Sequence, residues 1–400
     1  MRSELRIVSF LPAATEMVCA LGLGDRLAGI SHECDYPPSV RAKPVVVRPA
    51  LELEKMTLHE IDVAVSARLR TGASLYQIDE QRLRELAPTL ILTQNLCQVC
   101  APSGNEVSQV LKAMSPPPEI LWLTPKSLEG VNDNLRELGR ATGRTDAAEA
   151  LIASGRERLD EISALTRRAA TRPRVFCLEW VDPLYCSGHW ISEMVELAGG
   201  ADALSRRGTD SVRIAWADVI RWAPEVLVVM PCGFSLRKAV EQVSQLYAHP
   251  GWADLPAVRS GRVFAVNANA YFARPGPRLV DGTELLAHLF HPDLVAWSGP
   301  DDAFEQLRGR VGCPQPTVDF RPVGATGPTP MSSDHFQTSC TKCCSRCGAE
   351  FLCGPVDGRE NCWCDDLPPV GPVAGGGHDC MCPSCLRAAI AKLTPDEKSS

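Results

Sequence analysis

The sequence predicts an α/β protein with two lobes, a long connecting helix and a small cysteine-rich module near its carboxyl end. Three observations carry this prediction. Short apolar runs alternate with helical patterns in two separate regions, which is typical of mainly parallel sheets covered on both faces. Between these regions, apolar residues recur at helical spacing. Ten of the 18 cysteines fall between Cys340 and Cys385.

These patterns divide the chain into six segments. They are an N-terminal α/β lobe (1–126), a connecting helix (127–170), a second α/β lobe (171–298), a linker (299–338), a cysteine-rich module (339–390) and a tail (391–400). The linker is rich in Pro, Gly, Ser and Asp, with one short helix expected at 303–308.

Apolar runs mark the expected strands, at 5–11, 27–31, 89–93, 120–123, 174–179, 226–230 and 262–266. Thr57 and Glu60 have the spacing of a capping box at the start of a helix. The helix expected over 146–168 would be about 35 Å long, so it can span two lobes.

Composition and termini exclude several classes of protein. The net charge is −7, and the sequence has no run of lysines and arginines. These features argue against nucleic-acid binding. No apolar run reaches the roughly 18 residues of a spanning helix, which argues against membrane insertion. The start of the chain lacks a clear secretory signal and the cysteines are scattered, which indicates a soluble cytoplasmic monomer.

One stretch stands out as a candidate binding site, between the last strong strand and the amphipathic helix that follows it. Residues 268–278 carry Tyr271, Phe272 and Arg274 at this strand exit, where ligands bind in open α/β sheets. Two aromatics and an arginine suit a large ligand that is partly apolar and partly anionic. Trp180 and Tyr185 follow the first strand of the second lobe and add another wall.

Soft metal-binding side chains follow two strands of the first lobe. His32 and Cys34 lie after one strand, and Cys97 and Cys100 after another. Nitrogen and sulfur donors suit zinc, iron, copper or the cobalt of a corrinoid, to which an imidazole or a thiolate can be an axial ligand. A thiol switch is one alternative, and buried cysteines acting as small hydrophobic residues are another.

Several motifs, in their order and spacing, resemble one family over residues 5–295. They are the Arg6–Glu16 segment, the Asp35-Tyr36-Pro37 turn, the Pro88–Leu92 strand, the connecting helix, Ala198–Ala201 and the 268–278 stretch. Together they resemble the helical-backbone (class III) substrate-binding proteins of vitamin B12 and iron-siderophore ABC importers.

The resemblance implies two Rossmann-like lobes joined by one long helix, with a ligand held in the cleft between them. For cobalamin-binding members, it implies cleft positions at Tyr36, Trp216, Tyr271 or Phe272, and Arg274. The opposite wall is then formed by 32–36 and by the segment from Gln94 to Cys100. The implied ligand is cobalamin, a related corrinoid or another small-molecule metal chelate.

The cysteine-rich module has the spacing of a metal site. Its eight candidate ligands are Cys344, Cys347, Cys353, Cys362, Cys364, Cys380, Cys382 and Cys385. Two Cys-x-x-Cys pairs near the ends of such a segment are typical of structural zinc, and eight thiolates fill two sites. An iron–sulfur cluster is the alternative. The pattern resembles the small cysteine-rich CWC family, and the module is a candidate surface for a protein partner.

The sequence therefore predicts a cytoplasmic binding protein for a corrinoid or related metal chelate, with zinc in its C-terminal module. No nucleophile elbow, phosphate loop or catalytic carboxylate pair stands out, so it is not expected to be an enzyme. Three alternatives stay open: an exported component of a B12 or siderophore importer, a metal- or corrinoid-dependent enzyme, and a protein that only makes protein contacts.

Overall fold

The structure is a computed structural model that describes residues 4–52, 56–71, 73–94 and 114–307, with the backbone of 340–343 and 350–353. The chain forms two compact units. The first comprises Met1–Val243 and Leu255–Gln306, and the second Ser244–Asp254 and Leu307–Ser400. The sheets of both α/β lobes lie in the first unit.

The first lobe is built on a six-stranded sheet with the order β4-β3-β2-β1-β5-β6. All neighbouring strands are parallel except β4, which runs antiparallel to β3. The strands are β1 (Ile7–Ser9), β2 (Leu27–Ser31), β3 (Val45–Pro49), β4 (Tyr76–Ile78), β5 (Leu90–Thr93) and β6 (Glu119–Trp122). Every residue of β1 and β5 is buried, as expected for parallel strands covered on both faces.

Helices and turns connect these strands, as parallel pairing requires. They are α1 (Pro12–Ala20), η1 (Gly24–Arg26), η2 (Pro38–Ala42), α2 (Leu58–Thr71) and α3 (Glu80–Leu86). The capping box of α2 is present: the Thr57 backbone N–H donates to Glu60 Oε2 at 2.8 Å, and the Glu60 N–H donates to Thr57 Oγ1 at 3.3 Å. That part of the sequence analysis is confirmed.

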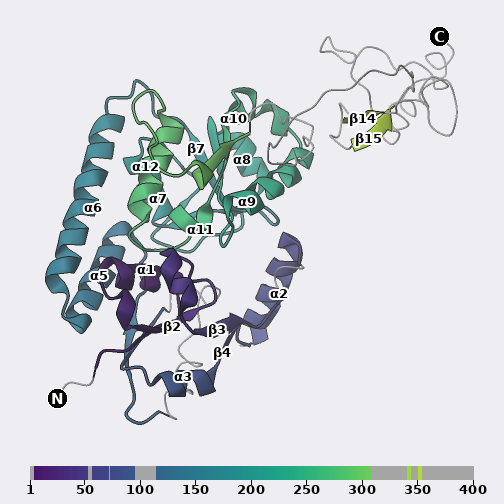
Figure 1. Cartoon of the computed structure of the whole chain (residues 1–400). Helices are drawn as coiled ribbons and strands as arrows, with labels where there is room; N and C mark the ends of the chain where they lie inside the picture. The colour runs from purple at the N-terminus through teal and green to yellow at the C-terminus, as the bar shows by residue number, and fades with distance from the viewer. Residues whose placement is uncertain are drawn as a thin grey trace, which may run out of the picture. The chain divides into compact units, whose positions relative to one another are not determined.

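Two helices join the lobes, α5 (Leu128–Thr142) and α6 (Thr145–Thr166). Ser127 caps α5 by accepting the Gly130 N–H at 3.0 Å, and Gly143 ends it in the left-handed conformation at φ 68°. Helix α6 has 22 residues and is therefore about 33 Å long. In Figure 1, α6 runs from the level of α1 and α5 to the level of α7 and α12.

The second lobe has a five-stranded sheet with the order β13-β12-β11-β7-β8, whose two edge strands are antiparallel. The strands are β7 (Val175–Trp180), β8 (Tyr185–Cys186), β11 (Val226–Val229), β12 (Val263–Val266) and β13 (Phe304–Gln306), with a separate ladder of β9 (Gly188–His189) and β10 (Arg206–Arg207). The helices are α7 (Ile191–Leu197), α8 (Trp216–Trp222), α9 (Leu236–Val243), α10 (Pro256–Arg259), α11 (Ala268–Tyr271) and α12 (Leu279–Phe290), followed by the turn η6 (Asp301–Ala303).

The expected helix at 303–308 is wrong, because Phe304–Gln306 forms the edge strand β13. It pairs antiparallel with β12, and the Phe304 ring lies edge-on to Phe264 at 6.2 Å between centroids. Pairing with an existing sheet edge outweighs a weak local helical preference. The second sheet therefore continues past residue 298, the expected end of the second lobe.

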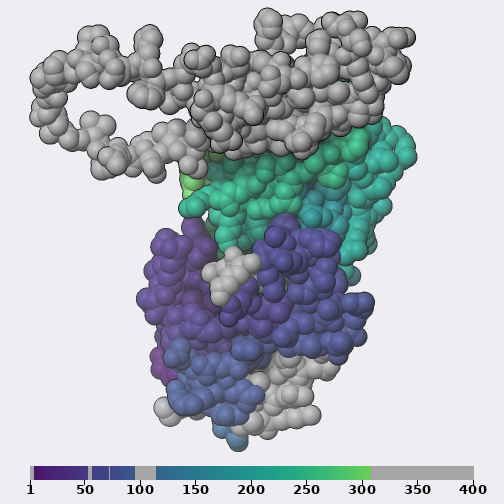
Figure 2. Space-filling model, turned by 90° about the vertical axis from the view of Figure 1, so that its right-hand side faces the viewer, coloured from purple at the N-terminus to yellow at the C-terminus, as the bar shows by residue number. Residues whose placement is uncertain are grey.

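One continuous apolar core runs through both lobes. It passes from the first sheet to the second by way of the buried faces of α5 and α6, at Leu135, Leu138, Ile152 and Ile162. Figure 2 shows the lobes in direct contact, the first in purple and blue and the second in teal. Within the described residues, no helix is both long and apolar enough to cross a membrane.

In the second unit, the structure describes two 3-10 turns, η4 (Ser244–Ala248) and η5 (Trp252–Asp254), and a hairpin of β14 (Cys340–Cys343) and β15 (Glu350–Cys353). The hairpin is antiparallel, and its register sets Cys340 opposite Cys353. The other predicted metal ligands lie outside the described residues: Cys344, Cys347, Cys362, Cys364, Cys380, Cys382 and Cys385.

The close approach of α12 to the end of α11 requires a glycine. A Cβ atom added at Gly282 would collide with the Tyr271 carbonyl oxygen and lie 2.9 Å from Met194 Cε. We expect Gly282→Ala to lower the free energy of unfolding by about 1–3 kcal/mol, since the backbone must shift. Urea denaturation of purified protein measures the change.

Gly155→Ala in α6 is the matched control, because its added Cβ would meet only Val280 Cγ2 at 3.4 Å. This variant should keep or raise stability by up to about 1 kcal/mol through helix propensity. Equal midpoints for the two variants would contradict the packing argument.

Candidate functional site

The carboxyl ends of the central strands define where a ligand site is expected. In the first sheet, β1 lies between β2 and β5, so the strand order reverses there. In the second sheet, the parallel strands β7, β11 and β12 end at the same edge, and the antiparallel β8 flanks β7. Open α/β sheets bind ligands outside the carboxyl ends of their parallel strands, most often where the strand order reverses, as it does at β1.

A cluster of four charged side chains joins the two lobes beside these strand ends. Arg278 of the second lobe holds Glu16 of the first in a bidentate pair, with Nε to Oε2 at 2.8 Å and Nη2 to Oε1 at 2.5 Å. Arg274 reaches Asp35 at 2.5 Å and Glu16 at 3.4 Å, and donates to the Glu33 carbonyl oxygen at 2.9 Å. We call Glu16, Asp35, Arg274 and Arg278 the junction cluster.

The junction cluster is largely removed from water. The side chains of Glu16 and Arg274 are 3% and 8% exposed, whereas Asp35 is 43% exposed. Burial works against the charge of Arg274, but its hydrogen bond to Asp35 and the nearby Glu16 and Glu33 charges outweigh this and raise its pKa. The cluster pairs two carboxylates with two guanidinium groups, so its formal charges balance.

Tyr36 extends this cluster toward solvent. The Arg278 guanidinium carbon lies 4.2 Å from the centre of the Tyr36 ring, in cation–π contact. Tyr36 is 45% exposed, which is unusual for a large aromatic side chain. The predicted cleft residue Tyr36 is therefore at the lobe junction, with ring surface open to solvent.

A second group of contacts joins the lobes through α2, which Figure 1 shows on the side of the first lobe away from α5. Asp62 of α2 pairs with Arg213 Nη2 at 2.5 Å and accepts from the Tyr185 hydroxyl at 3.1 Å. His59 Nδ1 lies 3.7 Å from Asp182 Oδ1. The predicted wall residue Tyr185 thus contacts the opposite lobe directly.

Aromatic side chains follow the strands of the second lobe. The Trp180 ring lies edge-on to Phe234 at 5.6 Å, and its indole N–H donates to the Asp182 carbonyl at 3.0 Å. Trp216 is the first residue of α8. Trp180 and Trp216 are both half-buried. Two residues after Trp180, Asp182 contacts the first lobe, and so does Arg213, three residues before Trp216.

Tyr271 and Phe272 are packing residues in this structure. They are 7% and 3% exposed, and the Tyr271 ring is edge-on to Trp297 at 5.9 Å. The Trp190 indole donates to the Phe272 carbonyl oxygen at 2.9 Å. They fix the loop that carries Arg274, and a ligand contact for either ring stays a prediction.

The predicted thiol site is only partly described. Cys34 is buried, its sulfur lies 3.0 Å from Thr15 Oγ1, and burial raises the pKa of its thiol to about 12. A thiol held neutral is a poor metal ligand. Cys97 and Cys100 lie outside the described residues, and Gln94 is buried at the end of β5. Among described residues, no three His, Cys, Asp or Glu side chains are grouped to hold a metal.

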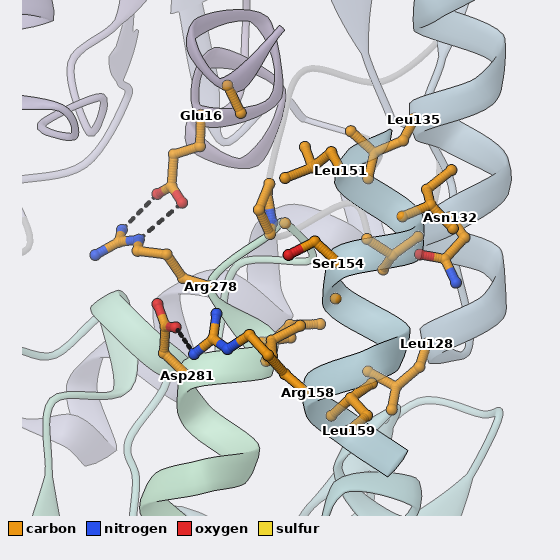
Figure 3. A pocket seen from close by; sticks show the side chains of 18 of the residues that line it. Glu16, Leu128, Asn132, Leu135, Leu151, Ser154, Arg158, Leu159, Arg278 and Asp281 are labelled. Carbon is orange, nitrogen blue, oxygen red and sulfur yellow. Dashed lines mark hydrogen bonds and ion pairs between the residues drawn. The ribbon is translucent and has the colours of Figure 1, made fainter. Parts of the chain in front are cut away.

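A cavity of about 400 Å³ lies on the connecting-helix side of the junction cluster. Figure 3 shows the Glu16–Arg278 pair on one side and leucines of α5 and α6 on the other. Arg158 of α6 lines it and pairs with Asp281 at 2.6 Å and Glu284 at 2.8 Å. These pairs tie α6 to α12 and hold the second lobe against the connecting helices.

Sequence reasoning missed most of the charged residues that join the lobes. Glu16 and Arg278 were inside quoted motifs, but only Arg274 was singled out. Asp62 and Arg213 were not considered. The sequence did contain one indication of the junction cluster. A second arginine, Arg278, lies four residues after Arg274 at the start of the amphipathic helix.

Two half-buried carboxylates lie at strand β7 of the second lobe, Glu179 within the strand and Asp202 bonded to the Cys177 N–H. Burial raises the pKa of Glu179 to about 7, although the Gly188 N–H and the Ser211 side chain donate to it. Burial also raises the pKa of Asp202 to about 6, although three backbone N–H groups donate to it. Ionising either group costs the folded state free energy.

We expect Glu16→Gln to lower the free energy of unfolding by about 3–5 kcal/mol, because it leaves two buried guanidinium groups undercompensated. Thermal unfolding of the purified chain measures this loss. The control is Glu129→Gln, which breaks pairs of a carboxylate that is 53% exposed. It should cost less than about 1 kcal/mol. Similar losses in both variants would argue against a structural role for the junction cluster.

Stability should fall as the pH rises from about 4.5 to 7, because the folded chain keeps the Glu179 proton to higher pH than the unfolded chain does. Glu179→Gln removes the Glu179 part of this fall, while the part due to Asp202 remains, and should raise stability at pH 8 by about 1–3 kcal/mol. Urea midpoints at pH 4.5, 6 and 8 measure the profile. A variant that is less stable than wild type at pH 8 would contradict the argument.

Comparisons with known proteins agree with this fold. A vitamin B12-binding protein of Vibrio cholerae is 27% identical over 283 residues, covering 70% of this chain and 86% of that protein. An uncharacterised ABC transporter substrate-binding lipoprotein of Bacillus subtilis, YvrC, is 26% identical over 293 residues, covering 72% and 80%. The apo structure of the periplasmic heme-binding protein RhuT from Roseiflexus sp. RS-1 matches with a TM-score of 0.55 at 23% identity, covering 72% and 99%.

Residues 7–270 match the family described as periplasmic binding protein. The expectation of a cytoplasmic location is therefore wrong, since the family is periplasmic and one relative is a lipoprotein. The prediction of a binding protein rather than an enzyme is confirmed by the same family and relatives. With its two α/β lobes joined by a long helix, the chain belongs to the periplasmic binding protein family.

Proposed function

We propose that this chain is the exported substrate-binding component of an ABC importer and that it binds a corrinoid between its lobes. The observation that carries the proposal is the meeting of the two sets of strand ends. Charged pairs hold them together on both sides, at the junction cluster and at Asp62. A ligand at this position contacts both lobes, as a binding protein requires.

The chemistry of the junction suits a large chelate with an apolar ring and polar edges. Trp180, Phe234 and Tyr36 offer aromatic surface. Arg274 can bind an anionic group of the ligand if that group takes the place of the half-exposed Asp35. A phosphate or carboxylate of the ligand then replaces the Asp35 carboxylate as a partner of Arg274.

A corrinoid is favoured over heme by the sequence relatives. The vitamin B12-binding protein of Vibrio cholerae shares 27% identity over most of this chain. The heme-binding structure is 23% identical, which supports the fold without specifying the ligand. Heme and ferric siderophores are therefore the competing ligands in the test below.

For the C-terminal cysteines, zinc stays a proposal that rests on thiol spacing. Two Cys-x-x-Cys pairs, beginning at Cys344 and Cys382, suit two tetrahedral four-thiolate sites. A partner for this module is likewise proposed from composition, as is a monomeric state for the chain.

We expect the purified chain to bind one equivalent of cyanocobalamin, measured by equilibrium dialysis and calorimetry. Trp216→Ala should weaken this binding about threefold to tenfold, the contribution of an aromatic contact. Arg213, three residues before Trp216, pairs with the first lobe, so Trp216 lies close to the junction.

Trp222→Ala on the same helix is the control, because the Trp222 indole donates to the Val175 carbonyl at 2.8 Å within the second lobe. It should lower stability and leave affinity unchanged. Binding of hemin or a ferric siderophore in preference to cyanocobalamin would replace the corrinoid assignment. Failure to bind any of these chelates would refute the proposed function.

A further inference from the structure

We propose that Nε2 of His32 binds the metal of the chelate as an axial ligand. The inference rests on the proposed function and adds a specific metal contact to it. A corrin cobalt or a heme iron receives four equatorial nitrogens from its own macrocycle, so one protein side chain is enough to complete an axial position. The metal is cargo, held by its chelate before it reaches the protein.

Hydrogen bonding favours one tautomer of His32. Its Nδ1 lies 3.2 Å from the Val47 backbone carbonyl oxygen and 3.4 Å from the Ser31 hydroxyl oxygen. The carbonyl oxygen can only accept and the hydroxyl oxygen can also accept, so a proton on Nδ1 satisfies both contacts. In the neutral imidazole, Nε2 then has a free lone pair. Metal-binding histidines are oriented in this way, by a bond from the other ring nitrogen to a carbonyl or carboxylate.

The position of His32 brings it to the edge of the sheet that faces the second lobe. His32 directly follows β2, and its backbone N–H donates to the Val47 carbonyl at 3.0 Å. The next residue, Glu33, accepts a hydrogen bond from Arg274 of the second lobe through its carbonyl oxygen. The imidazole is therefore one residue from a direct contact between the lobes.

The surroundings of the ring leave Nε2 available. The His32 side chain is 25% exposed, and its ring lies 6.4 Å from the Tyr76 ring. Within the described residues, the polar atom recorded near Nε2 is Glu33 Oε1 at 3.8 Å, too far for a hydrogen bond. That carboxylate lies close enough to stabilise the positive charge of a bound trivalent metal.

The neighbouring candidates are less suitable. Cys34 is a buried neutral thiol, as described above. His189 has its Nε2 already 2.9 Å from Asp210 Oδ1. His32 thus combines partial exposure, a hydrogen bond that favours a free Nε2 lone pair, and a place at the lobe junction.

The test compares two corrinoids that differ in one axial position. Aquacobalamin has an exchangeable water on cobalt, whereas cyanide blocks that position in cyanocobalamin. We expect the full chain to shift the visible absorption bands of aquacobalamin, and those of hemin if heme binds. Cyanocobalamin should bind without such a shift.

His32→Asn is the informative variant, because its amide nitrogen can keep the bond to Val47 while Nε2 is lost. It should abolish the spectral shift and weaken aquacobalamin binding about tenfold, clearly more than it weakens cyanocobalamin binding. His288→Asn is the control, since His288 Nδ1 also bonds a carbonyl, that of Val295 at 2.8 Å, at the end of α12. It should keep the shift.

A shift that persists in His32→Asn would overturn the axial contact, and so would wild-type protein that binds aquacobalamin or hemin with an unchanged spectrum. In both cases normal cyanocobalamin binding would leave the proposed function standing. If no corrinoid or heme binds at all, the proposed function fails and the axial contact fails with it.

Discussion

The buried Glu16 carboxylate, which holds Arg278 in a bidentate pair and lies 3.4 Å from Arg274, is the contact on which the arrangement of the lobes depends. Desolvating these charges is costly, and apolar side chains of similar volume would often be as stabilising. Ion pairs differ from apolar contacts in requiring defined directions and distances. The cluster therefore fixes how the first residues of α12 sit against α1.

The connecting helices also hold the two lobes in a fixed arrangement. Helix α6 contributes to a core that continues through both lobes, and its Arg158 is paired with two carboxylates of α12. A second pair at Asp62 joins the lobes through α2. With three separate attachments, the strand ends are positioned before any ligand arrives. Preorganisation of this kind lowers the conformational cost of binding.

How much of this was predictable depends on whether a feature leaves a local pattern. Buried parallel strands such as Leu90–Thr93 read as continuous apolar runs, so most central strands were found. The edge strands β4 and β13 have three residues each and are half-buried, so their runs carry little signal. Arg274 was found from its position, but Glu16 is 258 residues away, and such a pairing leaves no local pattern.

The periplasmic location of the family bears on the redox state expected of the cysteines in this chain. Oxidising compartments favour disulfides, yet the described cysteines, Cys19, Cys34, Cys177, Cys186 and Cys232, are free thiols. Burial protects most of them, since it raises the thiol pKa of Cys34 and of Cys177 and thiolate is the reactive form. Most of the C-terminal cysteines lie outside the described residues, and their spacing is the basis of the zinc proposal. In an oxidising compartment, disulfides are the competing state for these thiols, and measuring zinc together with the number of free thiols on the intact protein distinguishes the two.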